Sequence, residues 1–216
     1  MSGQDIHIFF RFNKNQVQAC ETVSAYEQFG KLQGALLFRV DLYIAGSLQE
    51  CALAAKALGI DRIGGSYDGK VINDVVYRSS SALSRPMNFP YLSVSDKVDS
   101  LQSADLITIS NFRKAKASLK KKLKAGLGIE FLLHPARKMN AEELSKWFAE
   151  LLEAHIFCES SGCQFILSSG ARWPIEMISG RSFDEILTEV GIDYHKHWRD
   201  MDRWLSRTLA KKVIMK

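Results

Sequence analysis

The stretch "GIEFLLHPARKMNAEELSKWFAELLEAHIFCESSGCQFILSS", residues 128–169, predicts the architecture of the chain. It begins with an apolar run at 128–133, continues as a helical pattern at 140–157 and ends with a second apolar run at 163–169. Both apolar runs are nearly continuous, which is typical of strands covered on both faces of a parallel sheet. Asn140 and Glu143 form a capping box at the start of the helical pattern. This strand–helix–strand order predicts a βαβ unit.

The same alternation extends through the chain. Further apolar, β-rich runs lie at 6–12, 35–43, 61–67, 91–95 and 105–110, and a helix at 47–59 starts on Ser47 and ends on Gly59. We therefore expect an α/β protein that forms one TIM-barrel-like (β/α) barrel over residues 1–216, complete or somewhat irregular. A basic C-terminal helix is expected at about 194–216. A doubly wound open sheet is the alternative, because spacing alone cannot close a barrel.

Two segments carry further expectations. Residues 68–90 give the least clear pattern, and within them "SSSALSRPMNFP", residues 79–90, is interpreted as a long loop. In the helix at 140–157, the apolar stripe expected to face the core consists of Leu144, Trp147, Phe148, Leu151, Leu152 and Ile156.

Composition favours a protein of the cytoplasm. No run reaches the roughly 18–20 apolar residues of a membrane span, and the N-terminus lacks the pattern of a signal peptide, so no membrane partner is expected. The cysteines form no CxxC pair and are interpreted as reduced core thiols: Cys20, Cys51, Cys158 and Cys163. The net charge of +5 favours a polyanionic partner.

The usual catalytic and metal-binding motifs are missing from the sequence. The five histidines form no HxxxH or HExxH pattern, and "HKH" at 195–197 falls in a predicted helix, where residues two apart point in different directions. There is no Gly-x-Ser-x-Gly elbow and no phosphate-binding loop ending in Gly-Lys-Ser/Thr. We interpret the histidines as polar surface or hydrogen-bonded core residues rather than as metal ligands.

The strongest local signal is a basic helix at 111–126. Asn111 suits its N-cap, and Phe112, Ala115, Leu119 and Leu123 make its core-facing stripe. It contains no acidic residue, and its cations are Arg113, Lys114, Lys116, Lys120, Lys121, Lys122 and Lys124. A solvated helix usually mixes charges of both signs. We therefore favour contact with nucleic-acid phosphates over a merely solvated face.

The C-terminal helix is basic to a lesser degree. Arg199, Arg203 and Arg207 share one stripe, opposite Trp198, Met201, Leu205 and Leu209. Asp200 and Asp202 dilute its charge, so packing on the barrel or on a protein partner remains as good an interpretation as RNA contact.

The segment "ILSSGARWPIEMISGRSFDEILTEVGI", residues 166–192, resembles protein component 3, the thirty-kilodalton subunit, of archaeal and eukaryotic ribonuclease P. In that family a buried strand ends in Ser-Ser, a loop with Pro, a carboxylate and Arg follows, and an Asp opens a Leu-rich helix. The matching residues here are Ser168, Ser169, Ala171, Pro174, Glu176, Arg181 and Asp184. Residues 104–111 and 128–140 resemble earlier parts of the family, so the likeness covers about 104–192, whereas 68–90 departs from it.

That family is similar in fold to the polymerase and histidinol phosphatase (PHP) phosphoesterases. Their first strand reads Asp-x-His-x-His and a late strand reads Ser-Ser-Asp-Ala-His. Here Asp5 and His7 are followed by Phe9, and Gly170 and Arg172 replace the late Asp and His. Arginine cannot ligate a metal, and its charge repels a divalent cation. The resemblance thus implies a PHP-like barrel without protein-bound metals.

The resemblance implies a non-catalytic protein subunit of ribonuclease P. In this family the RNA removes the 5′ leader of precursor tRNA with Mg²⁺, and the protein stabilises the folded RNA. The implied partners are the ribonuclease P RNA, precursor tRNA indirectly, a Pop5-type protein subunit and other ribonuclease P proteins. The implied location is the cytoplasm for an archaeal chain, or the nucleus and nucleolus for a eukaryotic one.

The candidate RNA contacts lie in the basic helix, in the turn after 128–133 and in the late loop. They are Arg113, Lys114, Lys116, Lys120, Lys121, Lys122, Lys124, His134, Arg137, Lys138, Arg172 and Arg181. For Arg172, a buried ion pair with Glu176 or Asp184 is an alternative. Two other functions remain open: a free-standing metal-dependent PHP-type phosphoesterase, and a basic α/β protein that binds another structured RNA or DNA.

Overall fold

Seven parallel strands form the centre of the protein. The computed structural model describes residues 37–80 and 89–214. Each strand pairs in parallel with the next along the chain. The strands are β1 (Val40–Ile44), β2 (Arg62–Ser66), β3 (Val75–Ser80), β4 (Tyr91–Ser95), β5 (Leu106–Thr108), β6 (Gly128–Leu132) and β7 (Gln164–Ser168).

The two ends of this sheet meet just beyond β7. Ile44 and Ala171 form a parallel bridge, with the Ala45 N–H donating to the Ala171 carbonyl at 2.7 Å. The Gly170 N–H donates to the Tyr43 carbonyl at 3.1 Å. The sheet is therefore a nearly closed, irregular TIM-like barrel, as predicted. The doubly wound alternative is wrong, because that fold reverses its strand order at a switch point.

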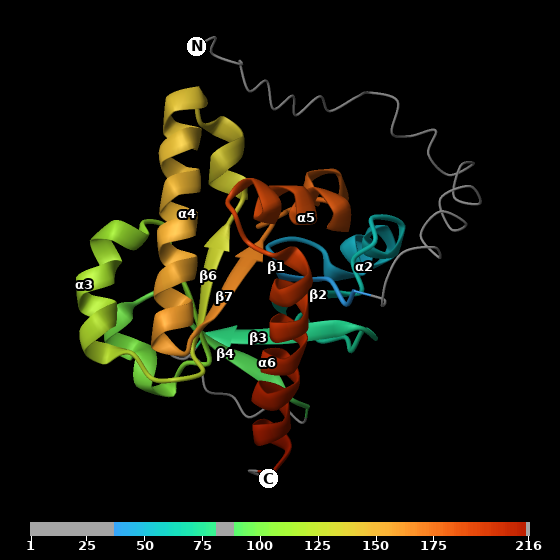
Figure 1. The fold of residues 1–216 in the computed structure, drawn as a ribbon. Helices are drawn as coiled ribbons and strands as arrows, with labels where there is room; N and C mark the ends of the chain where they lie inside the picture. Colours follow the sequence, from blue (N-terminus) through green and yellow to red (C-terminus); the bar gives the residue numbers. More distant parts are fainter. Residues whose placement is uncertain (1–36, 81–88, 215–216) are drawn as a thin grey trace. The chain divides into compact units, whose positions relative to one another are not determined.

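The helices cover the barrel unevenly (Figure 1). α2 (Leu48–Ala57), α3 (Phe112–Lys122) and α4 (Ala141–Ser161) each connect two successive strands, whereas residues 67–74 connect β2 to β3 without a helix. Among the described residues, the 3₁₀ helix η2 (Val98–Ser103) lies between β4 and β5, η3 (His134–Lys138) precedes α4 in the same connection, and η4 (Pro174–Glu176) lies between β7 and α5. α5 (Gly180–Glu189) and α6 (Tyr194–Ile214) follow β7.

The predicted helix starts are confirmed by their caps. The Ser47 side chain accepts from the Glu50 N–H, and the Asn111 side chain accepts from the Lys114 N–H. Asn140 and Glu143 form the full capping box of α4. α4 ends at Gly162, whose φ of 65° lies in the left-handed region that favours glycine.

Two expectations about elements are wrong. β3 includes Ser79 and Ser80, which the sequence placed at the start of the long loop, and its "VVYRSS" had not been recognised as a strand. On α4, Leu152 and Ile156 are exposed; Trp147 and Leu151 are buried as predicted, and Ala154, Phe157 and Cys158 complete the buried face. The small side chains of Ala154 and Cys158 let the helix pack closely on the sheet. The sequence pattern favoured the larger aliphatic residues and therefore did not indicate these two positions.

Asp184 does not open a helix, because α5 begins at Gly180 with Ser179 as its N-cap. The Asp184 carboxylate instead accepts hydrogen bonds from Arg39 at 2.7 Å and from the Trp198 indole N–H at 2.7 Å. It thereby joins the start of β1 to α5 and α6.

α6 is the predicted C-terminal helix, and it crosses the amino ends of the strands. The Trp204 indole donates to the Gly126 carbonyl at 2.8 Å, and Lys212 pairs with Asp105 at 2.8 Å. Trp198, Met201 and Trp204 are buried, whereas the stripe of Arg199, Arg203 and Arg207 is exposed. The helix therefore packs on the barrel and turns its arginines to solvent.

Some expectations fall outside the described residues. They are the strand at 6–12, the Asp5, His7 and Phe9 positions, Cys20, and residues 81–88 of the loop predicted at 79–90. Cys51, Cys158 and Cys163 are free thiols, as expected.

The closure of the barrel leaves no space at Gly46. A Cβ atom added there would lie 1.7 Å from the Arg172 carbonyl oxygen. We predict that Gly46→Ala lowers the free energy of unfolding by about 1–3 kcal/mol, measured by urea denaturation, because the closing strand ends must separate. The neighbouring Ala45→Ser, at an exposed side chain, should change it by less than about 0.5 kcal/mol. Equal effects of the two changes would contradict this closure.

Candidate functional site

The carboxyl ends of the strands form a ring of hydroxyl groups. Five of the seven strands end in a serine or threonine: Ser66, Ser80, Ser95, Thr108 and Ser168. The carboxyl end of such a barrel is where loops and strand ends build binding sites. This end is therefore the first place to look for function.

A buried ion pair lies beneath these hydroxyls. The Arg78 guanidinium donates two parallel hydrogen bonds to the Glu130 carboxylate, each 2.7 Å long. Arg78 is 5% exposed and Glu130 is 0% exposed. The hydroxyls of Thr108 and Ser168 also donate to Glu130, both at 2.7 Å. The pair thus joins β3 to β6 across the barrel interior, with β5 and β7 tied to it.

Arg78 is held from β1 as well. Its guanidinium donates to the Leu42 carbonyl at 2.6 Å and lies 4.4 Å from the centre of the Tyr43 ring. Both contacts favour the cation, so the arginine is fixed in position before any ligand arrives.

Asp41 is a second buried carboxylate near the site. One of its oxygens accepts the Ser169 N–H at 2.9 Å, and the other has no partner among the described residues. Burial raises the pKa of Asp41 to about 6, the Glu130 charge adds to this, and the hydrogen bonds from Ser169 and Tyr43 oppose it. The carboxyl therefore changes charge near neutral pH.

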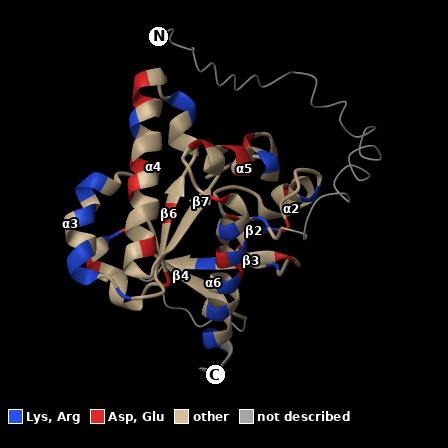
Figure 2. Ribbon diagram, in the orientation of Figure 1, with Lys and Arg blue, Asp and Glu red and all other residues tan. Residues whose placement is uncertain are grey.

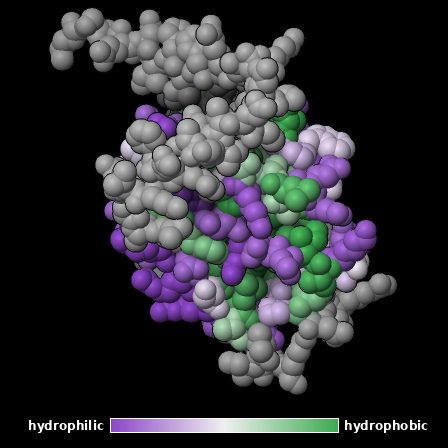
Figure 3. Space-filling model, turned by 90° about the vertical axis from the view of Figure 1, so that its right-hand side faces the viewer, coloured by the Kyte–Doolittle hydropathy of each residue, from purple (hydrophilic) through white to green (hydrophobic). Residues whose placement is uncertain are grey.

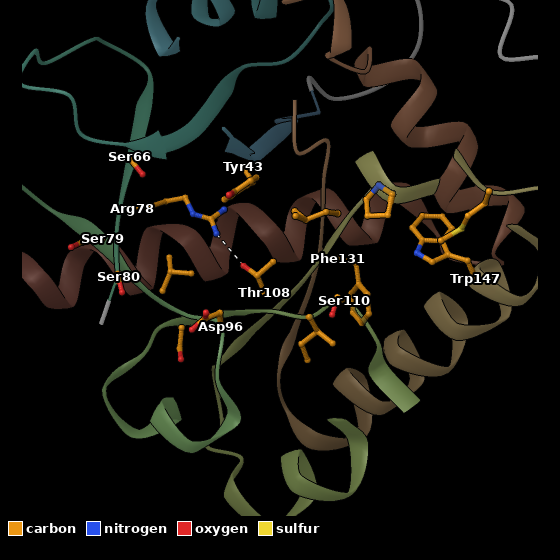
Figure 4. Close-up of a pocket in the computed structure, with 16 residues that line it drawn as sticks. Tyr43, Ser66, Arg78, Ser79, Ser80, Asp96, Thr108, Ser110, Phe131 and Trp147 are labelled. Carbon is orange, nitrogen blue, oxygen red and sulfur yellow. Dashed lines mark hydrogen bonds between the residues drawn. The ribbon is translucent and has the colours of Figure 1, made fainter. Parts of the chain in front are cut away.

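A cavity of about 520 Å³ opens above the ion pair (Figure 4). The last residues of β2, β3, β4, β5 and β6 all line it. Arg78 and Thr108 lie at its centre, joined by a hydrogen bond of 3.3 Å. The cavity falls within the usual size range of small-ligand sites, about 300–1,000 Å³.

The basic helix is α3, and it lies on the outer wall of the barrel beside α4 (Figure 2). Its cations have more acidic neighbours than the sequence indicated. Arg113 and Lys116 pair with Glu153 of α4, at 3.2 and 2.6 Å. Lys122 pairs with Asp99 of η2, and Lys124 donates to the Gln102 carbonyl.

Three cations of α3 make no ion pair with any described residue. Lys114, Lys120 and Lys121 are exposed, and no acidic side chain within residues 37–80 and 89–214 pairs with them. Lys114 and Lys121 are seven residues apart and so share one face of the helix. The charge without a partner on α3 is therefore carried by these three lysines, whereas the other four cations have partners among the described residues.

The other candidate residues divide between a cluster and isolated positions. His134 and Arg137 of η3 lie close to the β7 loop: Arg137 donates to the Glu176 carbonyl, and His134 lies against Gly170. Lys138 is exposed. Arg181 is also exposed and pairs with Glu185 one turn along α5, at 3.1 Å. The predicted RNA contacts therefore do not form one continuous surface with α3.

Arg172 does not form the buried ion pair weighed for it. Its side chain is exposed, and Asp184 is bound by Arg39 instead. The Glu176 carboxylate accepts the Arg172 backbone N–H at 2.7 Å, and this hydrogen bond holds the pKa of Glu176 below its usual range. Within the described residues, the Arg172 guanidinium is left for solvent or a partner.

Sequence reasoning missed Asp41, Arg78 and Glu130. Each is the single charged residue of its strand, in "VDLYI", "VVYRSS" and "GIEFL". A charge is rarely buried without a partner. Three such residues in three strands were therefore a signal for a polar barrel interior.

The described residues include no group of three or more His, Cys, Asp or Glu side chains placed to hold a metal ion. Their helices are also all too short or too polar to cross a membrane. At the late-strand position, Gly170 and Arg172 offer no side-chain metal ligand.

The buried carboxyl of Asp41 makes stability depend on pH. Its pKa in the folded protein, about 6, is above the unfolded value of 3.8, so the folded state binds more protons between these values. Stability is therefore lost as the pH rises through this window. We predict that Asp41→Asn gains stability relative to the parent over the same window, by about 2–3 kcal/mol between pH ~4 and ~7.5. The free energies of unfolding of both proteins are measured by urea denaturation at several pH values. A difference between Asp41→Asn and the parent that stays constant with pH would contradict this prediction.

The Arg78–Glu130 pair gives a non-additive prediction. Arg78→Met and Glu130→Gln should each cost about 3–5 kcal/mol of unfolding free energy, because each leaves one buried charge unpaired. The double variant leaves no charge, and Gln can still bond to Thr108 and Ser168. It should therefore be more stable than Arg78→Met alone, as measured by urea denaturation. Additive losses would show that the two side chains are not coupled.

Comparison with known proteins does not assign the chain to a family. No protein-family model matches the chain, and no curated protein matches it.

Proposed function

We propose that this chain is a protein subunit of ribonuclease P that binds the catalytic RNA and does not cut RNA itself. Three observations support the proposal. The sequence resembles protein component 3 over about 104–192, the described residues form the barrel that this resemblance implies, and α3 presents lysines without ionic partners.

The observation that carries the proposal is the exposed trio Lys114, Lys120 and Lys121 on α3. Neighbouring acids from η2 and α4 neutralise the other side of the helix and fix its position on the barrel. The three lysines are thus presented by a rigid element at a place that no described carboxylate reaches. RNA phosphates would relieve the mutual repulsion of the lysines, and the lysines would release counterions condensed on the RNA.

The surface elsewhere is less distinctive. The face turned to the viewer in Figure 3 shows hydrophobic patches separated by hydrophilic ones, so its apolar residues do not merge into one broad docking surface. Arg172, with the exposed Trp173 beside it, is a second place for RNA contact, because an exposed indole can stack on an unpaired base.

The alternative of a metal-dependent phosphoesterase gains no support at the β7 loop. A metal site of that kind needs carboxylate or imidazole ligands, and Gly170 and Arg172 provide neither. Divalent metal remains expected with the partner RNA, where Mg²⁺ offsets phosphate charge.

The proposal is tested with the ribonuclease P RNA of the source organism. We predict that the triple change Lys114→Glu, Lys120→Glu and Lys121→Glu weakens binding of this RNA at least about tenfold at moderate salt. It should also reduce the slope of log K against log salt concentration by about 2–3, because up to three phosphate contacts are lost.

A matched control has the same change in net charge elsewhere. Lys56, Lys70 and Lys97 are exposed and lie outside α3, and changing all three to Glu should affect the salt slope much less. Thermal unfolding of both variants checks that the fold is kept. If the two triple variants have the same slope, α3 is not the RNA surface. If the parent binds this RNA no better than an unrelated structured RNA of equal length, the assignment to ribonuclease P is wrong.

A further inference from the structure

The cavity at the carboxyl end of the barrel has two chemically different halves. One half is lined by Ser66, Ser79, Ser80, Ser95, Asp96 and Thr108. The other half is lined by Ile109, Phe131, Leu132, Pro135, Met139 and Trp147. Figure 4 shows Ser66, Ser79, Ser80 and Asp96 on one side of Arg78, and Phe131 and Trp147 on the other.

The cavity exists because small side chains end the strands. The interior of a (β/α) barrel is normally filled by layers of bulky branched side chains. Here the last layer is formed mainly by serine and threonine, which leave the space empty above Arg78. The ion pair beneath fixes the floor, so the walls cannot collapse inward to fill it.

The charge of the cavity disfavours an anionic ligand. Glu130 neutralises Arg78, and Asp96 adds a negative charge at the polar half. The described residues that line the cavity include no lysine and no second arginine. A phosphate group inside it would therefore lose hydration without gaining an unpaired cation.

The two halves together fit a compound with a hydroxyl-bearing ring at one end and a flat, weakly polar ring at the other. The exposed Ser66 hydroxyl and Asp96 carboxylate are suitable partners for sugar hydroxyls, since each can accept a hydrogen bond, whereas Ser95 and Thr108 already bond to Lys97 and to the Arg78–Glu130 pair. The apolar half, between Pro135, Met139 and Trp147, suits a planar group that needs little hydrogen bonding on its faces.

We propose that this cavity binds one nucleoside, with the ribose toward the serines and the base toward Trp147. The nucleoside is either free or an unpaired unit of a single-stranded RNA whose phosphates stay outside the cavity. This site is separate from the α3 lysines and does not depend on the RNA assignment proposed for them.

Isothermal titration of the full chain with adenosine, guanosine, cytidine and uridine tests the site. At least one nucleoside should bind saturably, and its 5′-monophosphate should bind more weakly. Ser66→Phe fills the mouth of the cavity from an exposed position, and it should weaken binding at least about tenfold. Ser110→Phe, at a second exposed lining position, should act in the same direction.

The matched control is Ser206→Phe, an exposed serine on α6 at the opposite end of the barrel, which should leave binding unchanged. The Lys114, Lys120 and Lys121 triple variant should also bind nucleosides normally, which separates this site from the RNA surface. Single-stranded hexanucleotides form a second arm. If hexanucleotides bind, free nucleosides do not, and both cavity variants weaken the hexanucleotide binding, then the nucleoside that occupies the cavity belongs to an RNA strand.

Three outcomes would overturn the proposal. The first is no saturable binding of any nucleoside or hexanucleotide. The second is binding that neither Ser66→Phe nor Ser110→Phe weakens while thermal unfolding shows both variants folded. The third is tighter binding of the 5′-monophosphate than of its nucleoside, because this would require an unpaired cation that the described lining residues do not provide.

Discussion

The buried pair of Arg78 and Glu130 is the interaction on which the carboxyl half of the barrel depends. Its hydrogen bonds reach β1 through the Leu42 carbonyl, β5 through Thr108 and β7 through Ser168, so five of the seven strands meet at one polar centre. A pair this deeply buried gains little net stability over an apolar pair of similar volume. What it provides is a fixed arrangement of strands, since neither charge can remain buried without the other.

The amino and carboxyl ends of the barrel differ in structure, and the Arg78–Glu130 pair contributes to this difference. At the amino end, α6 and Trp204 cover the small Gly128, where an added Cβ atom would lie 2.8 Å from the indole. At the carboxyl end, the ion pair fixes a floor and the terminal serines leave a cavity over it. The basic surface is on neither end but on the outer wall, at α3. A ligand cavity and an RNA surface can therefore coexist without sharing residues.

Much of the fold was predictable from local patterns. Continuous apolar runs indicated six of the seven described strands, and the caps at Ser47, Asn111 and Asn140 fixed three helix starts, because capping is a property of neighbouring residues. β3 was missed because its charged Arg78 and its serines resemble a loop unless the partner Glu130 is known. That partner is 52 residues away, and no local pattern reports it.

The candidate RNA surface on α3 also depends on residues that are distant in the sequence. Seven cations without an acid in the helix itself indicated uncompensated charge, yet Asp99 and Glu153 approach α3 from other elements. Charge density along a single helix overstates the free charge, because folding brings acids from distant segments to its sides. The physically relevant quantity is the number of cations left without partners once the neighbours are in place. For α3 these are Lys114, Lys120 and Lys121 within the described structure, and they set the largest salt dependence that this surface can give to RNA binding.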